Sequence, residues 1–296
     1  MSGASPNGNP SQDYGLYEGV IPDGTAPTLA RLDQMLAGGF THVINYSLLY
    51  APTPALLLGY LDHAQTLGMR IWVALHHQSF YNPNVYGGNA AQNVYKRLAA
   101  ALGASDNASL TAAVVTLVKD HPAVTGYYVG DEVPAALIAR ERVHTDQIAS
   151  LDATHPRLIM MGGLRADPTA SFTSVTDCCD MLGFDYYPYG DDALPLASLP
   201  MNCAALEQVC QQYGKRAATT LQAFSWQQDF PPARCQQWPE CAPFPSTAQM
   251  RQQRDITLGA MQTVPPDVIF WYAYFQIQRW KDPATAWNSI VQAIAS

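Results

Sequence analysis

The feature that most constrains the fold of this chain is a regular alternation of short apolar runs with helical patterns. Helical patterns include residues 26–39, 54–68, 134–152 and 283–296. The predicted strands cover residues 14–20, 41–48, 70–76, 124–132, 157–163, 180–187, 216–224 and 268–275. Eight strand–helix units predict an α/β protein built as a single (β/α)8 TIM barrel.

The alternative to a closed barrel is an open, doubly wound sheet. Such a sheet usually has fewer strands, and no glycine-rich phosphate-binding turn follows the first predicted strand. We therefore predict a flexible segment over residues 1–12 and one barrel domain over residues 13–296. Long loops follow the third strand (77–123) and the seventh (225–246), at the face where barrel enzymes build their active sites.

Composition excludes several classes of partner. Of the 296 residues, 48% are hydrophobic and 14% charged, and the formal net charge is −8. Lysines and arginines form no basic run, so nucleic acid is not expected as a partner. No apolar run reaches about 18 residues, the length of a membrane-spanning helix, so no membrane partner is expected either. We expect a soluble monomer.

The cysteines are concentrated in one third of the chain, mostly in segments that read as loops, and lack the spacing of a zinc site. This pattern predicts disulfides and therefore a secreted or extracytoplasmic protein. Local pairs Cys203–Cys210 and Cys235–Cys241 are the expected bridges, which leaves the neighbours Cys178 and Cys179 unassigned.

Carboxylates, aromatic rings, histidines and amides lie at or near the carboxyl ends of the predicted strands. This mixture suits a sugar, because its hydroxyls need hydrogen-bond partners and its C–H faces stack on rings. A carbohydrate is therefore the expected partner. The candidate residues are Glu18, Asn45, Tyr46, His76, His77, Tyr128, Asp131, Glu132, Asp185, Tyr187, Gln222, Trp226, Trp271 and Tyr274.

The adjacent carboxylates Asp131 and Glu132 are the strongest candidates for chemistry. Partial burial of Glu132 among Tyr127, Tyr128 and Trp271, together with the charge of Asp131, is expected to raise its pKa toward that of a general acid. Glycoside hydrolysis requires such an acid, because the glycosidic oxygen leaves poorly unless it is protonated. The structural alternative is that the two acids cap the following helix.

Four strand ends resemble those of TIM-barrel glycoside hydrolases. They read VGDEVP (129–134), GFDYYP (183–188), LQAF (221–224) and FWYAYF (270–275). In the clan A pattern the fourth strand ends in Asn-Glu, where Glu is the acid/base and Asn binds the sugar 2-hydroxyl. The resemblance implies that Glu132 is the acid/base and that Asp131 takes the Asn position.

The chain departs from clan A at the end of the seventh strand, where Gln222 stands in place of the nucleophilic glutamate. Asp185 on the sixth strand is the first candidate for the second carboxylate, although its segment also reads as a strand-end turn. The second possibility is that Asp131 orients a substrate acetamido group, as in the Gly-Asp-Glu motif of β-hexosaminidases. Glu18 is the third.

The remaining candidates define the pocket wall and the rival functions. His76 and His77 are neighbours on a strand, so only one can easily face the pocket, where it would contact a sugar hydroxyl. The histidine pattern of metal-dependent barrels is missing, so neither metal nor organic cofactor is expected. Trp226, Trp271 and Tyr274 are candidate wall residues. The alternatives to a glycosidase are a glycan-binding barrel without activity and a metal-dependent hydrolase.

Overall fold

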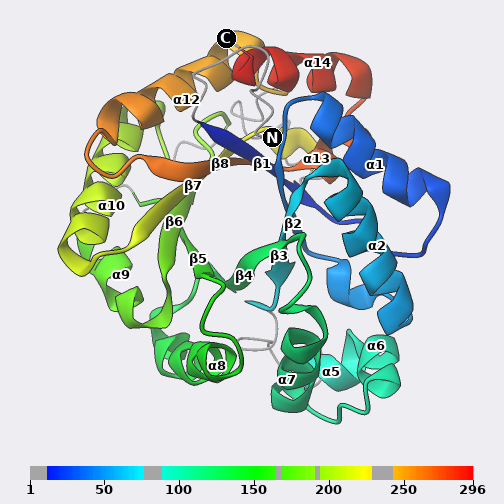
Figure 1. The fold of residues 1–296 in the computed structure, drawn as a ribbon. Helices are drawn as coiled ribbons and strands as arrows, with labels where there is room; N and C mark the ends of the chain where they lie inside the picture. Colours follow the sequence, from blue (N-terminus) through cyan, green and yellow to red (C-terminus); the bar gives the residue numbers. More distant parts are fainter. Residues whose placement is uncertain (1–11, 77–88, 165–167, 191–193, 229–242, 296) are drawn as a thin grey trace.

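The computed structural model describes residues 12–76, 89–164, 168–190, 194–228 and 243–295. Eight parallel strands pair in sequence order, and β8 pairs with β1 to close the barrel, with the helices outside (Figure 1). This confirms the predicted (β/α)8 architecture. The strands are β1 Asp13–Glu18, β2 His42–Asn45, β3 Arg70–Ala74, β4 Val124–Asp131, β5 Arg157–Gly162, β6 Met181–Tyr186, β7 Arg216–Gln222 and β8 Pro266–Tyr272.

The helices follow the strands in the predicted alternation. In residues 89–123, the part of the connection after β3 that the structure describes, there are three of them. The α-helices are α1 Ala26–Ala37, α2 Pro54–Leu67, α5 Ala90–Asn93, α6 Lys96–Ala101, α7 Asn107–Val118, α8 Ile138–Leu151, α9 Thr169–Ser174, α10 Leu199–Tyr213, α12 Thr247–Ala260, α13 Tyr274–Arg279 and α14 Pro283–Ile294. In the described part of the chain, no helix is both long and apolar enough to cross a bilayer.

Local signals explain where the helices begin and end. The Thr53 side chain accepts a hydrogen bond from the backbone at the start of α2, and Gly68 ends that helix at φ +72°, in the left-handed region that glycine favours. A capping box of Ser246 and Gln249 opens α12. The long predicted helices therefore stop within a few residues of the expected positions.

Two apolar layers hold the barrel together. Alternate strand residues such as Tyr17, Ile44 and Met160 fill its interior. Their neighbours, such as Leu16 and Val43, pack between the strands and the helices. Because parallel strands are buried on both faces, they appear in the sequence as nearly continuous apolar runs.

The prediction for the cysteine pair Cys203–Cys210 is wrong. Both residues lie in α10 seven positions apart, and both are buried free thiols. Seven helical residues span about 10 Å, whereas a disulfide requires Cα atoms within roughly 7 Å. Cys178 and Cys179 are also buried free thiols. The predicted pair Cys235–Cys241 and nearly all of the N-terminal segment 1–12 lie outside the described residues.

Candidate active site

A β-bulge in β4 directs Asp131 into the barrel. Tyr128 pairs with Leu158 of β5 and Asp131 pairs with Met160, so β4 carries one residue more than β5 over this stretch. Leu158 and Met160 both face the barrel interior. With strict alternation from the inward-facing Tyr128, Asp131 would face outward. The extra residue therefore brings Asp131 to the inner face.

Glu132 extends from β4 across the end of β5 toward β6. Its φ is +48°, an unusual and strained conformation for a residue other than glycine, and its backbone N–H donates to the carbonyl of Met160 at 2.8 Å. A Cβ atom added to Gly162 would lie 3.1 Å from Glu132 Oε1. Gly162 pairs with Asp185 of β6, so the missing side chain leaves room for Glu132 to reach Asp185.

The Asp185 carboxyl is buried and feels the charge of two other acids. Only 8% of the residue is exposed. Burial, the negative charges of Glu132 and Asp131, and a hydrogen-bonding contact with Glu132 raise the pKa of Asp185 well above its usual range, while the Tyr187 hydroxyl opposes this shift. The raised pKa means that Asp185 keeps its proton to a higher pH than an ordinary aspartate does.

Asp131 is held by phenol groups. The Tyr46 hydroxyl donates a hydrogen bond to Asp131 Oδ2 at 2.9 Å. Burial raises the pKa of Asp131 to about 6; Tyr128 and Tyr46 oppose the shift, and the charge of Glu132 adds to it. Burial and the charge of Asp131 in turn raise the pKa of Tyr46 and Tyr128 well above the usual range, so both remain neutral donors.

Glu132 itself is exposed to solvent. The expected burial of its carboxyl among Tyr127, Tyr128 and Trp271 is therefore wrong, because Tyr127 and Trp271 face the layer between barrel and helices. Asp185 is the buried acid of the group, Asp131 is half-buried, and Glu132 is the member that a ligand can reach from outside.

Aromatic rings line the barrel around these acids. Tyr46 contacts Tyr17, His76, Tyr128 and Tyr272, with ring centroids 5.0–6.3 Å apart. Tyr187 contacts Phe224, Trp226 and Tyr272 at 5.0–6.3 Å. This aromatic lining consists of Tyr17, Tyr46, His76, Tyr128, Tyr187, Phe224, Trp226, Tyr272 and Phe275. His77 lies outside the described residues.

Four predicted residues lie away from this group. The Glu18 carboxylate is buried and binds Arg31 of α1 with two hydrogen bonds of 2.8 and 2.7 Å. Asn45 is also buried, and its side-chain amide donates to the carbonyl of Val20. Trp271 and Tyr274 belong to the layer between barrel and helices. Glu18 is thus placed away from the acids of β4 and β6.

The same alternation accounts for the residues that the sequence predictions missed. Tyr17 and Tyr272 face the barrel interior. Their sequence neighbours Glu18 and Trp271, which were predicted as site residues, face the helices. The expected eighth strand also ran too far, because β8 ends at Tyr272 and α13 begins at Tyr274. A consistent inward and outward assignment along each strand could have found Tyr17 and Tyr272.

Gln222 is bound into the backbone at the end of β7. Its Oε1 accepts from Tyr189 N–H at 2.8 Å, and its Nε2 donates to the carbonyls of Tyr189 at 2.8 Å and Phe224 at 3.1 Å. The residue is fully buried. A carboxylate could not donate to these two carbonyls, so this position requires an amide.

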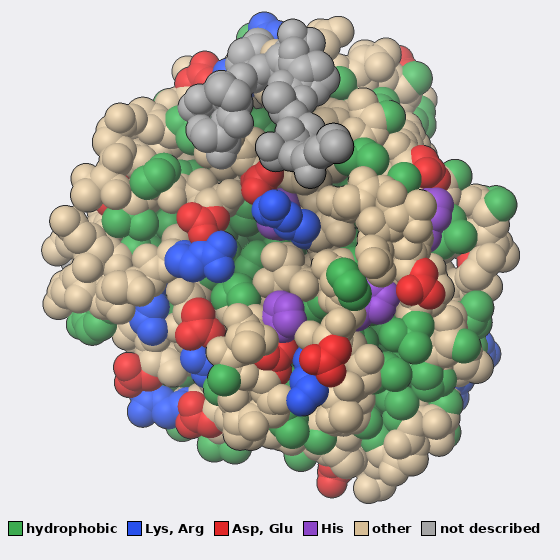
Figure 2. All heavy atoms as spheres, in the orientation of Figure 1, with side chains coloured by type: hydrophobic (Ala, Val, Ile, Leu, Met, Phe, Trp, Pro, Cys, Tyr) green, Lys and Arg blue, Asp and Glu red, His purple; other side chains and the backbone are tan. Residues whose placement is uncertain are grey.

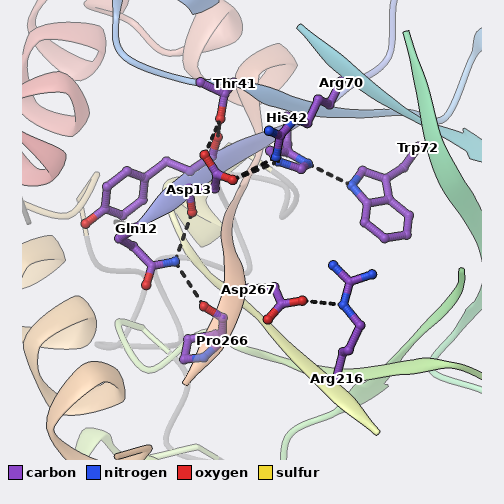
Figure 3. Close-up of polar contacts among 10 residues, drawn as sticks. Gln12, Asp13, Thr41, His42, Arg70, Trp72, Arg216, Pro266 and Asp267 are labelled. Atoms are coloured by element: carbon purple, nitrogen blue, oxygen red, sulfur yellow. Dashed lines mark hydrogen bonds and ion pairs between the residues drawn. The ribbon is translucent and has the colours of Figure 1, made fainter. Parts of the chain in front are cut away.

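The described residues hold no group of three or more His, Cys, Asp and Glu side chains arranged as metal ligands. At the opposite end of the barrel, a cavity of about 710 Å³ opens among the strand starts. Its charged groups form matched pairs, Arg70 with Asp13 and Arg216 with Asp267 (Figure 3). Figure 2 shows this face, with basic and acidic side chains side by side around its centre.

Comparison with known proteins shows the fold and no closer relationship. No protein-family model and no curated protein matches the sequence. The structure resembles GH5_18 from Streptomyces cattleya in complex with Manb1-4GlcNAc, at 13% identity and TM-score 0.57, covering 88% of this chain and 71% of that one. It also resembles the β-D-glucuronidase of Dictyoglomus thermophilum, at 14% identity and TM-score 0.55, covering 91% and 44%.

A third similar structure is the β-galactosidase of Marinomonas ef1, at 11% identity and TM-score 0.57, with 89% of this chain and 54% of that one covered. At these identities the similarity establishes the barrel fold. The chain spans about half the length of the last two proteins.

Proposed function

We propose that the protein is a glycoside hydrolase in which Glu132 and Asp185 form the catalytic pair. The observation that carries the proposal is the reach of Glu132 across Gly162 to the buried Asp185, at the carboxyl ends of the strands. Glycosidases acting through two carboxyl groups need one as an acid and one as a carboxylate. In this proposal Asp185, whose pKa is raised, brings a proton that the pair shares, which meets this requirement.

The exposure of the two groups suggests how they divide the work. Glu132 is exposed and reaches a glycosidic oxygen that enters from solvent, so it delivers the shared proton to the leaving group. Asp185 then becomes a carboxylate that faces the developing positive charge on the sugar. Water, deprotonated by Glu132, completes hydrolysis.

The close approach of the carboxyl groups favours retention of anomeric configuration. Inverting enzymes hold them about 6.5–9.5 Å apart to fit a water, whereas retaining enzymes hold them about 5–5.5 Å apart. A direct contact between Glu132 and Asp185 is nearer to the retaining arrangement. In this proposal Asp185 attacks the anomeric carbon and forms a covalent glycosyl-enzyme intermediate.

Asp131 and the aromatic lining bind the sugar in this proposal. Asp131 lies between the Tyr46 hydroxyl and Glu132, where it can accept a hydrogen bond from the 2-substituent of the sugar. Tyr187, Trp226 and Tyr272 supply ring surfaces for C–H faces. Poly- and oligosaccharides therefore suit the carboxyl ends of the strands as substrates.

A glycan-binding barrel without activity is the second candidate. It is favoured by Gln222, whose amide occupies the place of the usual nucleophile and is fixed by backbone hydrogen bonds. On this reading the acids of β4 and β6 bind sugar hydroxyls and transfer no proton.

Release of reducing ends from a panel of oligosaccharides, with wild type beside Glu132→Gln, tests the two functions. We expect the substitution to lower hydrolysis about 10²–10⁴-fold, the usual contribution of a general acid, while affinity for the same glycan persists. Unchanged hydrolysis would remove Glu132 as the acid. Binding by the wild type with no release from any glycan would favour the second function. If Asp185→Asn keeps activity only on 2-acetamido sugars, the substrate supplies the nucleophile.

A further inference from the structure

A second pocket opens beside the aromatic lining, where the connections after β1 and β8 meet. Its volume is about 360 Å³, and its wall includes Gly19, Asp23, Arg31, Phe275, Gln278 and Arg279. This volume lies within the roughly 300–1,000 Å³ typical of ligand pockets. Because both connections leave the carboxyl ends of their strands, the pocket lies at the same end of the barrel as Glu132 and Asp185.

Phe275 joins this pocket to the aromatic lining. Its ring centroid lies 5.5 Å from that of Tyr272, which in turn contacts Tyr187. A Cβ atom added to Gly19, which also lines the pocket, would lie 3.3 Å from the Phe275 ring. The pocket and the aromatic lining therefore share the Phe275 side chain, so that one glycan chain could contact both.

The two arginines of the pocket differ in their partners. Arg31 lies over the Tyr274 ring and is neutralised by the buried carboxylate of Glu18. Arg279 is exposed, and its guanidinium lies 5.8 Å from the centre of the Phe275 ring. Among the described residues, no hydrogen bond or ion pair to a side-chain or backbone oxygen engages Arg279. Its positive charge and its N–H donors remain open to a ligand.

The other polar groups of the pocket suit sugar hydroxyls. Asp23 is fixed by hydrogen bonds from Thr25, 2.9 Å from the backbone N–H and 2.8 Å from the hydroxyl, which orient its carboxylate as an acceptor. Asp23 also adds a negative charge that partly offsets Arg279. Gln278 supplies both a donor and an acceptor. Lys281, which lies over Trp280 two residues beyond Arg279, adds a further positive charge nearby.

We propose that this pocket is a subsite for an acidic sugar unit, whose carboxylate or sulfate binds Arg279 while its hydroxyls bind Asp23 and Gln278. The proposal rests on the proposed glycosidase function and narrows its substrates to glycans that carry an anionic residue next to the bond that is cleaved. Guanidinium pairs with carboxylate and sulfate oxygens through two parallel hydrogen bonds, which select for charge and geometry together.

Calorimetric binding to the full-length Glu132→Gln variant tests the subsite without turnover. The probes are a uronate-containing oligosaccharide, its carboxyl-reduced neutral counterpart, and a sulfated oligosaccharide of the same length. We expect the uronate or the sulfated probe to bind about tenfold more tightly than the neutral one at low salt, because charge-assisted hydrogen bonds are the strong ones. The preference should shrink as ionic strength rises. Which anionic probe binds better identifies the anion.

The matched variants are Arg279→Gln and Arg140→Gln, each made in the Glu132→Gln background. Arg140 is an exposed arginine of α8, on another sector of the barrel. Arg279→Gln should abolish the preference for the anionic probe, and Arg140→Gln should preserve it. Equal affinity for charged and neutral probes, or a preference that survives Arg279→Gln, would overturn the subsite. Neither result depends on whether Glu132 is catalytic, which the hydrolysis assay decides separately.

Discussion

Carboxylate side chains have different partners at the two ends of the barrel. At the strand starts, Asp13 pairs with Arg70 and Asp180 with Arg157, at 3.0 and 2.8 Å. At the strand ends, Asp131, Glu132 and Asp185 act mainly on one another and on tyrosine hydroxyls. The pKa of Asp13 is lowered, chiefly by a hydrogen bond with His42, whereas burial raises the pKa of Asp131 and Asp185.

This difference separates a stabilising end from a reactive one. A carboxylate that is paired with a cation favours the folded state and has no proton to give. Carboxyl groups that are buried together retain a proton near neutral pH, and the fold must tolerate their repulsion. Substitutions at the two ends should therefore differ in their effects on hydrolysis and on stability.

Replacing Asp185 with Asn is expected to give the largest effect. Hydrolysis should fall about 10³-fold, within the range for loss of an acid/base or nucleophilic partner, because the amide can neither share the proton nor stabilise positive charge. Asp267→Asn, at the strand starts, is the control and should leave hydrolysis unchanged. Initial rates of reducing-end release measure both. If Asp185→Asn keeps more than a tenth of wild-type activity, Asp185 is not a member of the pair.

Replacing Gln222 with Glu should destabilise the protein without creating a nucleophile. The new carboxylate would face the carbonyls of Tyr189 and Phe224, which now accept from the amide. Loss of these bonds inside the protein should lower the free energy of unfolding by about 3 kcal/mol. Gln262→Glu is the control, since this exposed glutamine also donates to a backbone carbonyl, and it should cost less than about 0.5 kcal/mol. Urea denaturation measures both; a gain in hydrolysis by Gln222→Glu would contradict the structural role of Gln222.

Asn substitutions at Asp131 and Asp13 should change stability in opposite directions. The folded-state pKa of Asp131 is raised to about 6 from 3.8, so its ionised form destabilises the fold above pH 6, and this cost disappears below pH 3.8. Asp131→Asn should therefore raise the free energy of unfolding at pH 7 by up to about 3 kcal/mol and leave it unchanged at low pH.

The folded-state pKa of Asp13 is lowered, so its stabilising contribution is present above the unfolded pKa of 3.8 and is lost as the pH falls through the folded value. Asp13→Asn should thus destabilise at pH 7 and converge with wild type in acid. Urea titrations at pH 7 and at low pH measure both variants. The same sign for both at pH 7 would contradict the contrast between the two ends.

The barrel could be predicted from sequence because its signal is repeated eight times. Each strand is apolar on both faces, so an error of a few residues at a strand end, as in β8, leaves the architecture unchanged. The same property hides which residues face inward. Glu18 and Trp271 were predicted to line the site, whereas the residues that face inward are their neighbours Tyr17 and Tyr272.

The geometry of the acids depends on features that composition and spacing do not reveal. The bulge in β4 brings Asp131 inward, and the positive φ of Glu132 turns its side chain over Gly162. Sequence reasoning identified Asp131, Glu132 and Asp185 as candidates because carboxylates at strand ends are few. It could not identify Gly162, because this residue contributes only by lacking a side chain. It also predicted that Glu132 is buried, whereas the buried acid is Asp185.

Replacing Gly162 with Ala is expected to have the smallest effect. The added Cβ would lie 3.1 Å from Glu132 Oε1, close enough to shift the carboxyl by a few tenths of an ångström. Since a misplacement of about 1 Å can cost about 10²-fold in rate, we expect about a tenfold loss of hydrolysis, with the unfolding free energy nearly unchanged. Initial rates and urea denaturation measure the two quantities.

The matched control for Gly162→Ala is Gly259→Ala, at the other end of the barrel. Gly259 lies in α12 beside the cavity among the strand starts, and an added Cβ would meet no atom within 4 Å. Alanine should stabilise this helix by roughly 0.5–1 kcal/mol without affecting hydrolysis. If both alanines leave the rate unchanged, the reach of Glu132 across Gly162 is not needed for catalysis. If only Gly162→Ala lowers the rate of hydrolysis, the space left by the missing side chain of Gly162 is required by Glu132 and Asp185 and not by the fold.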